Sequence, residues 1–130
     1  MKILKSVCLV TQDVRELCDF YSRVLELSAE GDDSFVLFST PGIRLSICSI
    51  QIVEAKAPGL KVDPPSGNCF LEFEVEDVDQ EYERLKALQV NVIKPPTTQP
   101  WGLRSVWFCD PQGNRINIYA SVPAASVLAE

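Results

Sequence analysis

The sequence contains no histidine, so no site in this chain can use an imidazole side chain. Histidine is the commonest metal ligand in proteins and a frequent general acid or base near neutral pH. A zinc, nickel, iron or manganese site would have to be built from carboxylates and thiolates alone. This absence counts against the most usual kinds of metalloenzyme.

Paired cysteines are also missing. The five cysteines are an odd number, and none are arranged as Cys-x-x-Cys. This pattern indicates neither a disulfide framework nor a zinc cage. Free thiols fit a reducing compartment, so we expect a cytoplasmic protein.

Long apolar runs and excess positive charge are lacking as well. The start, MKILKSVCLV, turns polar at Thr11, which is too soon for a signal peptide or a membrane span. The net charge is −6 and the pI about 4.7, so we expect neither nucleic acid nor a membrane as partner. With 130 residues and 46% hydrophobic side chains, the chain can form one compact domain with a real core.

The pattern of apolar residues predicts one order of elements that occurs twice. In the first half we expect a strand, a helix capped by Asp13, and a hairpin; in the second half, a strand, a helix capped by Asp77, a short strand and a hairpin. The proline- and glycine-containing segment Gln51–Asn68 reads as a linker. The predicted strands are Leu4–Val10, Phe35–Phe38, Ile43–Ile47, Cys69–Val75, Val90–Ile93, Val106–Cys109 and Asn114–Tyr119.

The two halves can be superposed. Asp13 falls on Asp77, and the hairpin segment GIRLSIC falls on GNRINIY. This agreement indicates an internal duplication of a βαβββ unit. We therefore predict an α+β fold in a single domain, 1–130, with repeat units at about 1–50 and 67–121 and a linker at 51–66.

Side chains on a strand alternate between its two faces, so the strand positions can be sorted. One set should pack under the helices: Val7, Leu9, Phe38, Leu45, Ile47, Leu71, Phe73, Val75, Val106, Phe108, Ile116 and Ile118. The other should line a shared concave surface: Ser6, Cys8, Arg44, Ser46, Cys48, Phe70, Glu72, Glu74, Ser105, Trp107, Cys109, Arg115, Asn117 and Tyr119.

Three segments together resemble the vicinal oxygen chelate superfamily, which includes glyoxalase I, the bleomycin resistance proteins and the extradiol dioxygenases. They are VCLVTQDVRELCDFYSRVLEL, FLEFEVEDVDQEYERLKALQV and PWGLRSVWFCDPQGNRINIY. The resemblance implies paired βαβββ units that form a half-open, cupped mixed sheet with helices on its outer face. It also implies an interior that holds a metal or a ligand, and, from the bleomycin resistance branch, a homodimer.

The family's metal ligands do not carry over to this sequence. The resemblance places them at Ser6, Ser46, Phe70 and Asn117, where related proteins often have His or Glu. Serine and asparagine oxygens are weak neutral ligands, and phenylalanine offers no donor. We expect no metal, no cofactor and no catalytic residue.

The concave set contains the candidate binding residues, and each has a plainer interpretation. Glu72 and Glu74 could act as an acid–base pair, bind a cation, or be solvated side chains. Trp107 and Trp101 could bind a ligand or pack, and Arg44 and Arg115 could neutralise the carboxylates. The cysteines are better explained as small fillers than as a thiolate site. The candidate ligand-binding residues are Ser6, Arg44, Ser46, Phe70, Glu72, Glu74, Trp101, Trp107, Arg115, Asn117 and Tyr119.

The sequence thus favours a binding protein that sequesters a small aromatic or cationic compound without a metal. We expect a planar cation between Trp107 and Phe70, with Glu72 or Glu74 as its counter-charge. Two alternatives stay open: a glyoxalase- or dioxygenase-like enzyme with an atypical or absent metal site, and a non-catalytic scaffold.

Overall fold

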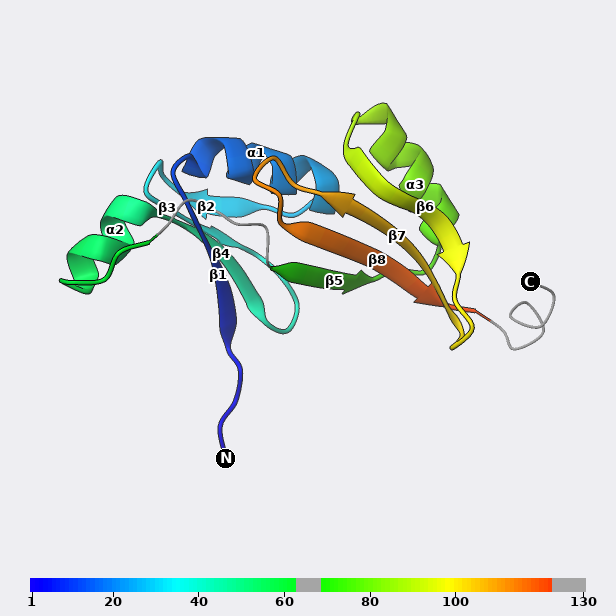
Figure 1. Cartoon of the computed structure of the whole chain (residues 1–130), viewed down its shortest axis with the longest axis horizontal. Coiled ribbons are helices and arrows are strands. Elements are labelled where there is room, and N and C mark those ends of the chain that lie inside the picture. The colour runs from blue at the N-terminus through cyan, green and yellow to red at the C-terminus, as the bar shows by residue number, and fades with distance from the viewer. Residues whose placement is uncertain (63–68, 123–130) are drawn as a thin grey trace. The chain divides into compact units, whose positions relative to one another are not determined.

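The computed structural model describes residues 1–62 and 69–122 (Figure 1). The chain divides into two compact units, Met1–Ser66 and Gly67–Glu130. Each unit carries its own four-stranded sheet.

Unit 1 contains four strands and two helices. In chain order they are β1 (Ser6–Thr11), α1 (Val14–Leu25), β2 (Ala29–Gly31), β3 (Phe35–Phe38), β4 (Arg44–Ser49) and α2 (Ile50–Lys56). The strand order is β1-β4-β3-β2. The first and last strands, β1 and β4, are parallel, and the other pairs are antiparallel.

Unit 2 repeats this arrangement. It consists of β5 (Phe70–Glu74), α3 (Val78–Ala87), β6 (Asn91–Thr98), β7 (Leu103–Cys109) and β8 (Arg115–Ser121), with the strand order β5-β8-β7-β6. Again the first and last strands are parallel and the others antiparallel. The predicted α+β class and the paired βαβββ units are confirmed.

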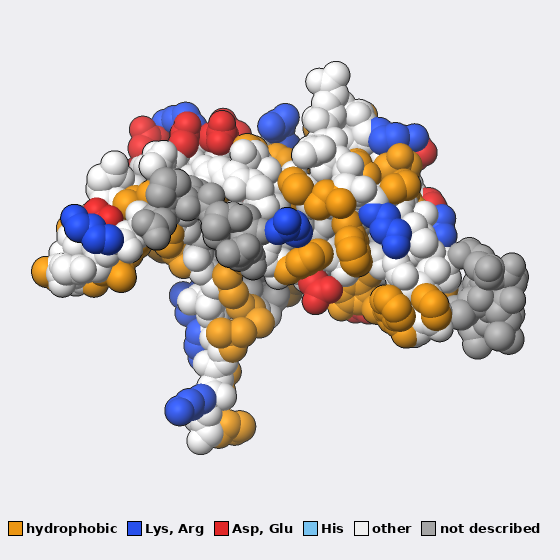
Figure 2. All heavy atoms as spheres, viewed as in Figure 1, with side chains coloured by type: hydrophobic (Ala, Val, Ile, Leu, Met, Phe, Trp, Pro, Cys, Tyr) orange, Lys and Arg blue, Asp and Glu red, His pale blue; other side chains and the backbone are white. Residues whose placement is uncertain are grey.

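Both predicted helix caps are present. The Asp13 carboxylate accepts a hydrogen bond from the backbone N–H of Glu16 at 3.0 Å, and Asp77 does the same for Gln80 at 3.1 Å. Each bond satisfies an amide that the first helical turn leaves without a partner. The apolar face of α1 is buried, whereas charged side chains gather over its outer face (Figure 2).

Each unit has its own core on the helix side of its sheet. In unit 1 the ring of Tyr21 on α1 packs edge-to-face on Phe38, with centroids 6.5 Å apart. In unit 2 the corresponding Phe108 is fully buried, as is Leu85 of α3. Of the predicted core positions, four on or directly after the first strands are only partly buried: Val7 on β1, Leu71 and Phe73 on β5, and Val75 just after β5. These strands lie at the edges of their sheets, where fewer neighbours cover them.

The structure corrects the predicted linker. Residues Ile50–Lys56 form helix α2, whose first turn is capped by the Ser49 hydroxyl accepting from the Ile52 N–H at 3.2 Å. The prolines and glycines that suggested a linker begin only after Lys56. The end of that segment, residues 63–68, lies outside the described residues.

Several strands also differ from prediction, and β1 begins at Ser6 rather than Leu4 and β7 at Leu103 rather than Val106. The three-residue β2 has no alternating pattern to reveal it, so it was missed. The short strand expected at Val90–Ile93 is in fact β6 and extends to Thr98, through Pro95 and Pro96. The pairing of β6 with β7 shifts register on both sides of Lys94, and β6 is an edge strand, which is where prolines are tolerated.

The Asp-Pro-Gln-Gly-Asn turn sets the register of β8. The Asp110 carboxylate accepts from the backbone N–H groups of Gln112 and Asn114 at 2.8 and 3.0 Å, and from the Asn114 side chain at 2.8 Å. Gly113 adopts a φ of 87°, which glycine does without strain. The turn therefore fixes which residues of β8 lie opposite those of β7.

The helices of the described chain are too short or too polar to cross a membrane.

An ion pair ties α3 to the sheet of unit 2. The guanidinium of Arg104 donates two hydrogen bonds to the Asp79 carboxylate, both at 3.0 Å, and a third to the Thr98 hydroxyl at 2.9 Å. The bonds from Arg104 hold the pKa of Asp79 below its usual value. Bidentate pairs of this kind are stronger than single contacts.

We predict that Arg104→Ala lowers the free energy of unfolding by about 1 kcal/mol, since the pair is partly screened by solvent. The control, Arg15→Ala, removes the exposed pair with Asp33 and should cost less. The pKa of Asp79 is lowered in the folded protein. The free energy that Arg104→Ala removes should therefore be largest above the usual carboxyl pKa, and it should disappear as the pH falls through the lowered pKa of Asp79. Urea unfolding at a series of pH values measures these free energies. Equal losses of unfolding free energy for the two variants would contradict the prediction.

Candidate functional site

One row of side chains crosses the whole sheet of unit 2. Glu72 on β5 is the register partner of Asn117 on β8, and Asn117 is the partner of Trp107 on β7. Trp107 in turn pairs with Lys94 on β6. Alternation places these residues on the face opposite the buried Val106, Phe108, Ile116 and Ile118. We call these four residues the unit-2 row.

Asn117 is the most buried member of the row, with 7% of its surface exposed. Its side-chain nitrogen donates a hydrogen bond to Glu72 Oε2 at 2.9 Å. This bond fixes the orientation of the amide, because the reverse orientation would set an oxygen against the carboxylate. Within the described chain, Asn117 Oδ1 is then buried without a hydrogen-bond donor.

Trp107 also has an unsatisfied polar atom. Its indole nitrogen, Nε1, is buried and has no acceptor within residues 1–62 and 69–122. A buried polar group without a partner costs about 1–3 kcal/mol. The row therefore holds one unused donor and one unused acceptor. They belong to neighbouring side chains on the adjacent strands β7 and β8.

The Trp107 ring already has two neighbours. Phe70 contacts it edge-to-face, with centroids 5.7 Å apart and planes at 80°. The ammonium of Lys94 lies 5.6 Å from the ring centroid, within cation–π range. The expected placement of a planar cation between Trp107 and Phe70 thus requires the two rings to separate, and Lys94 already supplies a cation to Trp107.

The two carboxylates of the site are on β5, and both residues are exposed. Glu72 is held by Asn117. Glu74 is the register partner of Tyr119 and forms no ion pair with any described residue. Unit 2 thus brings seven of the predicted residues onto one face of its sheet: Phe70, Glu72, Glu74, Trp107, Arg115, Asn117 and Tyr119.

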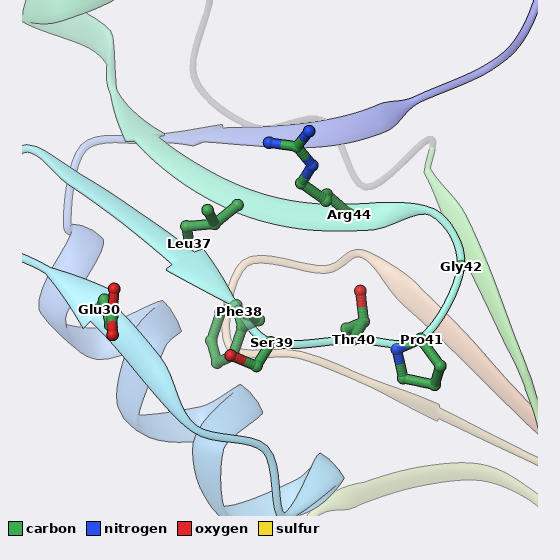
Figure 3. A pocket seen from close by; sticks show the side chains of 8 residues that line it. All are labelled: Glu30, Leu37, Phe38, Ser39, Thr40, Pro41, Gly42 and Arg44. Carbon is green, nitrogen blue, oxygen red and sulfur yellow. The ribbon is translucent and has the colours of Figure 1, made fainter.

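Three predicted residues belong to unit 1. Ser6 is the register partner of Arg44, and Ser46 is the partner of Cys8. Arg44 borders an open hollow of about 590 Å³, shown in Figure 3. Its guanidinium forms no ion pair or side-chain hydrogen bond with a described residue. The lining residues are Glu30, Leu37, Phe38, Ser39, Thr40, Pro41, Gly42 and Arg44.

Sequence reasoning named only Arg44 among the functional candidates in that hollow. Glu30 was missed because β2 was not predicted, and the hairpin residues were read only as a turn. A charged residue between Ala29 and Gly31 carries no signal that would single it out.

Trp101 lies apart from the unit-2 row, in the turn between β6 and β7. It is 69% exposed, the highest value for any aromatic side chain in the described chain. Hydrophobic side chains gather at this end of unit 2 (Figure 2). A large apolar side chain left in solvent often marks a contact surface.

Cys8 and Cys48 lie on the same face of neighbouring parallel strands. Burial, and secondarily the neighbouring Cys8, raise the pKa of the Cys48 thiol. A raised pKa keeps a thiol protonated and unreactive at neutral pH. This agrees with the interpretation of Cys48 as a small core filler.

The four positions at which the family resemblance places metal ligands do not form a donor set. The aromatic ring of Phe70 cannot coordinate, and the Asn117 amide is held by Glu72. In residues 1–62 and 69–122, no three His, Cys, Asp or Glu side chains cluster as metal ligands would. These residues do not fit the divalent ion that the fold family commonly binds.

Comparison with known proteins agrees with this fold. The family model of the glyoxalase/bleomycin resistance protein/dioxygenase superfamily matches residues 3–118. The chain belongs to this superfamily.

Several relatives share most of the chain. The uncharacterized protein YraH of Bacillus subtilis is 30% identical over 127 residues, covering 92% of this chain and 98% of YraH. A glyoxalase/bleomycin resistance protein/dioxygenase from Nocardioides is 26% identical with a TM-score of 0.81, covering 95% of this chain and 86% of the other. A lactoylglutathione lyase from Agrobacterium tumefaciens is 23% identical with a TM-score of 0.74, covering 92% and 94%, and shows the fold alone.

We predict that the purified protein binds no divalent metal tightly, because the four family positions carry only weak neutral oxygens or no donor at all. Elemental analysis, followed by calorimetric titration with nickel, zinc and iron(II), measures this. The melting temperature should be the same with and without EDTA. Tight one-to-one binding that Asn117→Ala abolishes would contradict the prediction.

Proposed function

We propose that this protein binds and sequesters a small organic compound without a metal, on the face of unit 2 that carries the unit-2 row. The observation that carries the proposal is the pair of buried, unpartnered atoms, Asn117 Oδ1 and Trp107 Nε1, at the centre of that face. Native proteins rarely leave such atoms unpaired unless they serve a ligand or a bound water. Binding and sequestering a small compound is also the kind of activity found in the bleomycin resistance members of the superfamily.

The charges on this face favour a cationic ligand. Glu74 has no ion-pair partner in the described chain, so it can accept one without breaking an existing contact. Lys94 lies over Trp107, so like-charge repulsion places the positive group of the ligand toward β5. There the carboxylates of Glu72 and Glu74 offset part of the cost of removing that charge from water.

An aromatic surface is available next to these carboxylates. The side chain of Phe70 is 47% exposed although its ring touches Trp107. A planar ligand stacked on the free side of Phe70 would gain about 0.5–1.5 kcal/mol beyond the area it buries. Stacking on the exposed side of Phe70 uses a surface that its contact with Trp107 leaves open.

An enzymatic function is the second candidate. Glu72 and Glu74 lie on one face of β5, a spacing that suits a pair of carboxylates with separate acid and base roles. The hydrogen bond from Asn117 would orient Glu72 for such a task. Turnover of a bound compound, followed by mass spectrometry, separates the two candidates.

We also propose that the protein is a cytoplasmic homodimer. The five thiols are all free, as is usual in a reducing compartment. The exposed Trp101 and the edge strands are surfaces that a second copy would cover. In the bleomycin resistance branch, two chains together build the ligand crevices.

For the ligand, we predict that Glu72→Gln/Glu74→Gln weakens binding of planar aromatic cations by about tenfold or more. Bleomycin and N-methylquinolinium are suitable probes, measured by calorimetry at two salt concentrations. The affinity of the unmodified protein should fall as salt rises. The control, Glu16→Gln/Glu83→Gln, makes the same change in net charge on the helices and should leave affinity unchanged. Stronger binding of an anion such as 2-naphthoate would refute the electrostatic assignment.

For assembly, we predict a dimer in dilute solution, measured by light scattering. Trp101→Ala should shift the protein toward the monomer of 14.5 kDa, with little change in melting temperature at high concentration, because the side chain is exposed. The control Phe35→Ala removes another exposed aromatic residue, on β3. A monomer at every concentration for the unmodified protein would disprove the prediction.

A further inference from the structure

We infer that the ligand of the unit-2 row carries a carboxamide, or an equivalent neutral group that donates and accepts hydrogen bonds at neighbouring atoms. This group would accept a hydrogen bond from Trp107 Nε1 and donate one to Asn117 Oδ1. The inference rests on the proposed function and adds the chemistry by which this site selects its ligand.

The roles of the two protein atoms are fixed by their surroundings. The hydrogen bond from Asn117 Nδ2 to Glu72 fixes the amide so that Oδ1 is its buried atom without a partner, and an amide oxygen can only accept. The indole nitrogen of Trp107 can only donate. The site therefore requires both a donor and an acceptor from whatever occupies it.

The two residues also lie close enough to bind one group together. Asn117 and Trp107 are register partners on the antiparallel strands β8 and β7. Side chains that face each other in this way have Cβ atoms about 4.5–5.5 Å apart. Neighbouring side chains of this kind can reach one small group, and a carboxamide carries its acceptor oxygen and its donor nitrogen on one carbon.

Other common polar groups match less well. A carboxylate has no hydrogen to give Asn117 and would lie beside the negative charge of Glu72. An ammonium group cannot accept from Trp107, and Lys94 is already near that ring. The positive charge of the ligand therefore belongs on another part of the molecule, toward Glu74.

Entry of the group requires a neighbouring side chain to move, because both protein atoms are buried. Phe70 is suited to this, since it is 47% exposed and lies on the edge strand β5, in contact with Trp107. An exposed ring changes rotamer quickly and at small cost. Phe70 would then stack on the ring to which the carboxamide is attached.

These features together describe a planar, positively charged ring with a carboxamide substituent. The test uses 1-methylnicotinamide as the probe with all these features. Two matched compounds each lack one of them: 1-methylpyridinium has the charge but no amide, and benzamide has the amide but no charge.

Binding is followed by NMR, using the indole N–H resonances of protein labelled with nitrogen-15. The sequence has two tryptophans, so Trp101→Phe assigns the Trp107 signal. We expect 1-methylnicotinamide and benzamide to move the Trp107 indole proton downfield, as a new hydrogen bond does. The charged compound without an amide should not move it.

Two substitutions test the atoms separately. Trp107→Phe removes the donor and keeps an aromatic ring, and Asn117→Leu removes the acceptor at similar volume. Each substitution should weaken the binding of 1-methylnicotinamide by about five- to tenfold. The affinity for 1-methylpyridinium should change by less than about twofold. Phe35→Leu, at an exposed position on β3, is the control that should change neither affinity. Thermal unfolding of each variant checks that it is folded.

The outcomes separate this inference from the proposed function. If 1-methylpyridinium binds as tightly as 1-methylnicotinamide and the Trp107 signal does not move, a water satisfies the two atoms and the carboxamide assignment is wrong, while cation binding stands. If benzamide binds at this site and neither cation does, the carboxamide assignment holds and the electrostatic part of the proposed function fails. If none of the three compounds binds at millimolar concentration, both are overturned.

Discussion

The parallel pairing of the first and last strands of each βαβββ unit is the constraint on which the candidate site depends. In unit 2 it places β8 between β5 and β7, so that one residue of β8 has a partner on each side. Asn117 occupies that position, with Glu72 on one side and Trp107 on the other. A shift of one residue along β8 would turn Asn117 into the core and Ile116 out of it. The turn held by Asp110 prevents such a shift.

The hydrogen bond between Asn117 and Glu72 gives this row its chemical character. It orients the amide, makes its oxygen an unused acceptor, and keeps a carboxylate beside the buried part of the site. The position that the family resemblance assigns to a metal ligand has thus become part of a polar surface with a fixed pattern of donor and acceptor. Such a pattern suits selective binding of an organic ligand, because a mismatched ligand leaves buried groups unpaired.

Much of the fold could be predicted because local signals agreed with one another. The caps Asp13 and Asp77, the helical spacing of apolar residues and the duplicated hairpin each indicated the same βαβββ unit. The misses have local causes too. Strand β2 is too short to show alternation, and α2 begins at a Ser49 cap in a segment whose later prolines suggested a linker.

The sequence by itself determined the class of fold, the alternation of faces along the strands that it predicted, and the lack of metal ligands at the family positions. These follow from residue types and from the two-residue period of a strand, which are local properties. Only the tertiary structure decided which side chains meet across strands: that Asn117 uses its nitrogen on Glu72, that Phe70 rests on Trp107, and that Lys94 already lies over that ring. Such contacts depend on the register and side-chain rotamers of strands far apart in the chain, which no local pattern specifies.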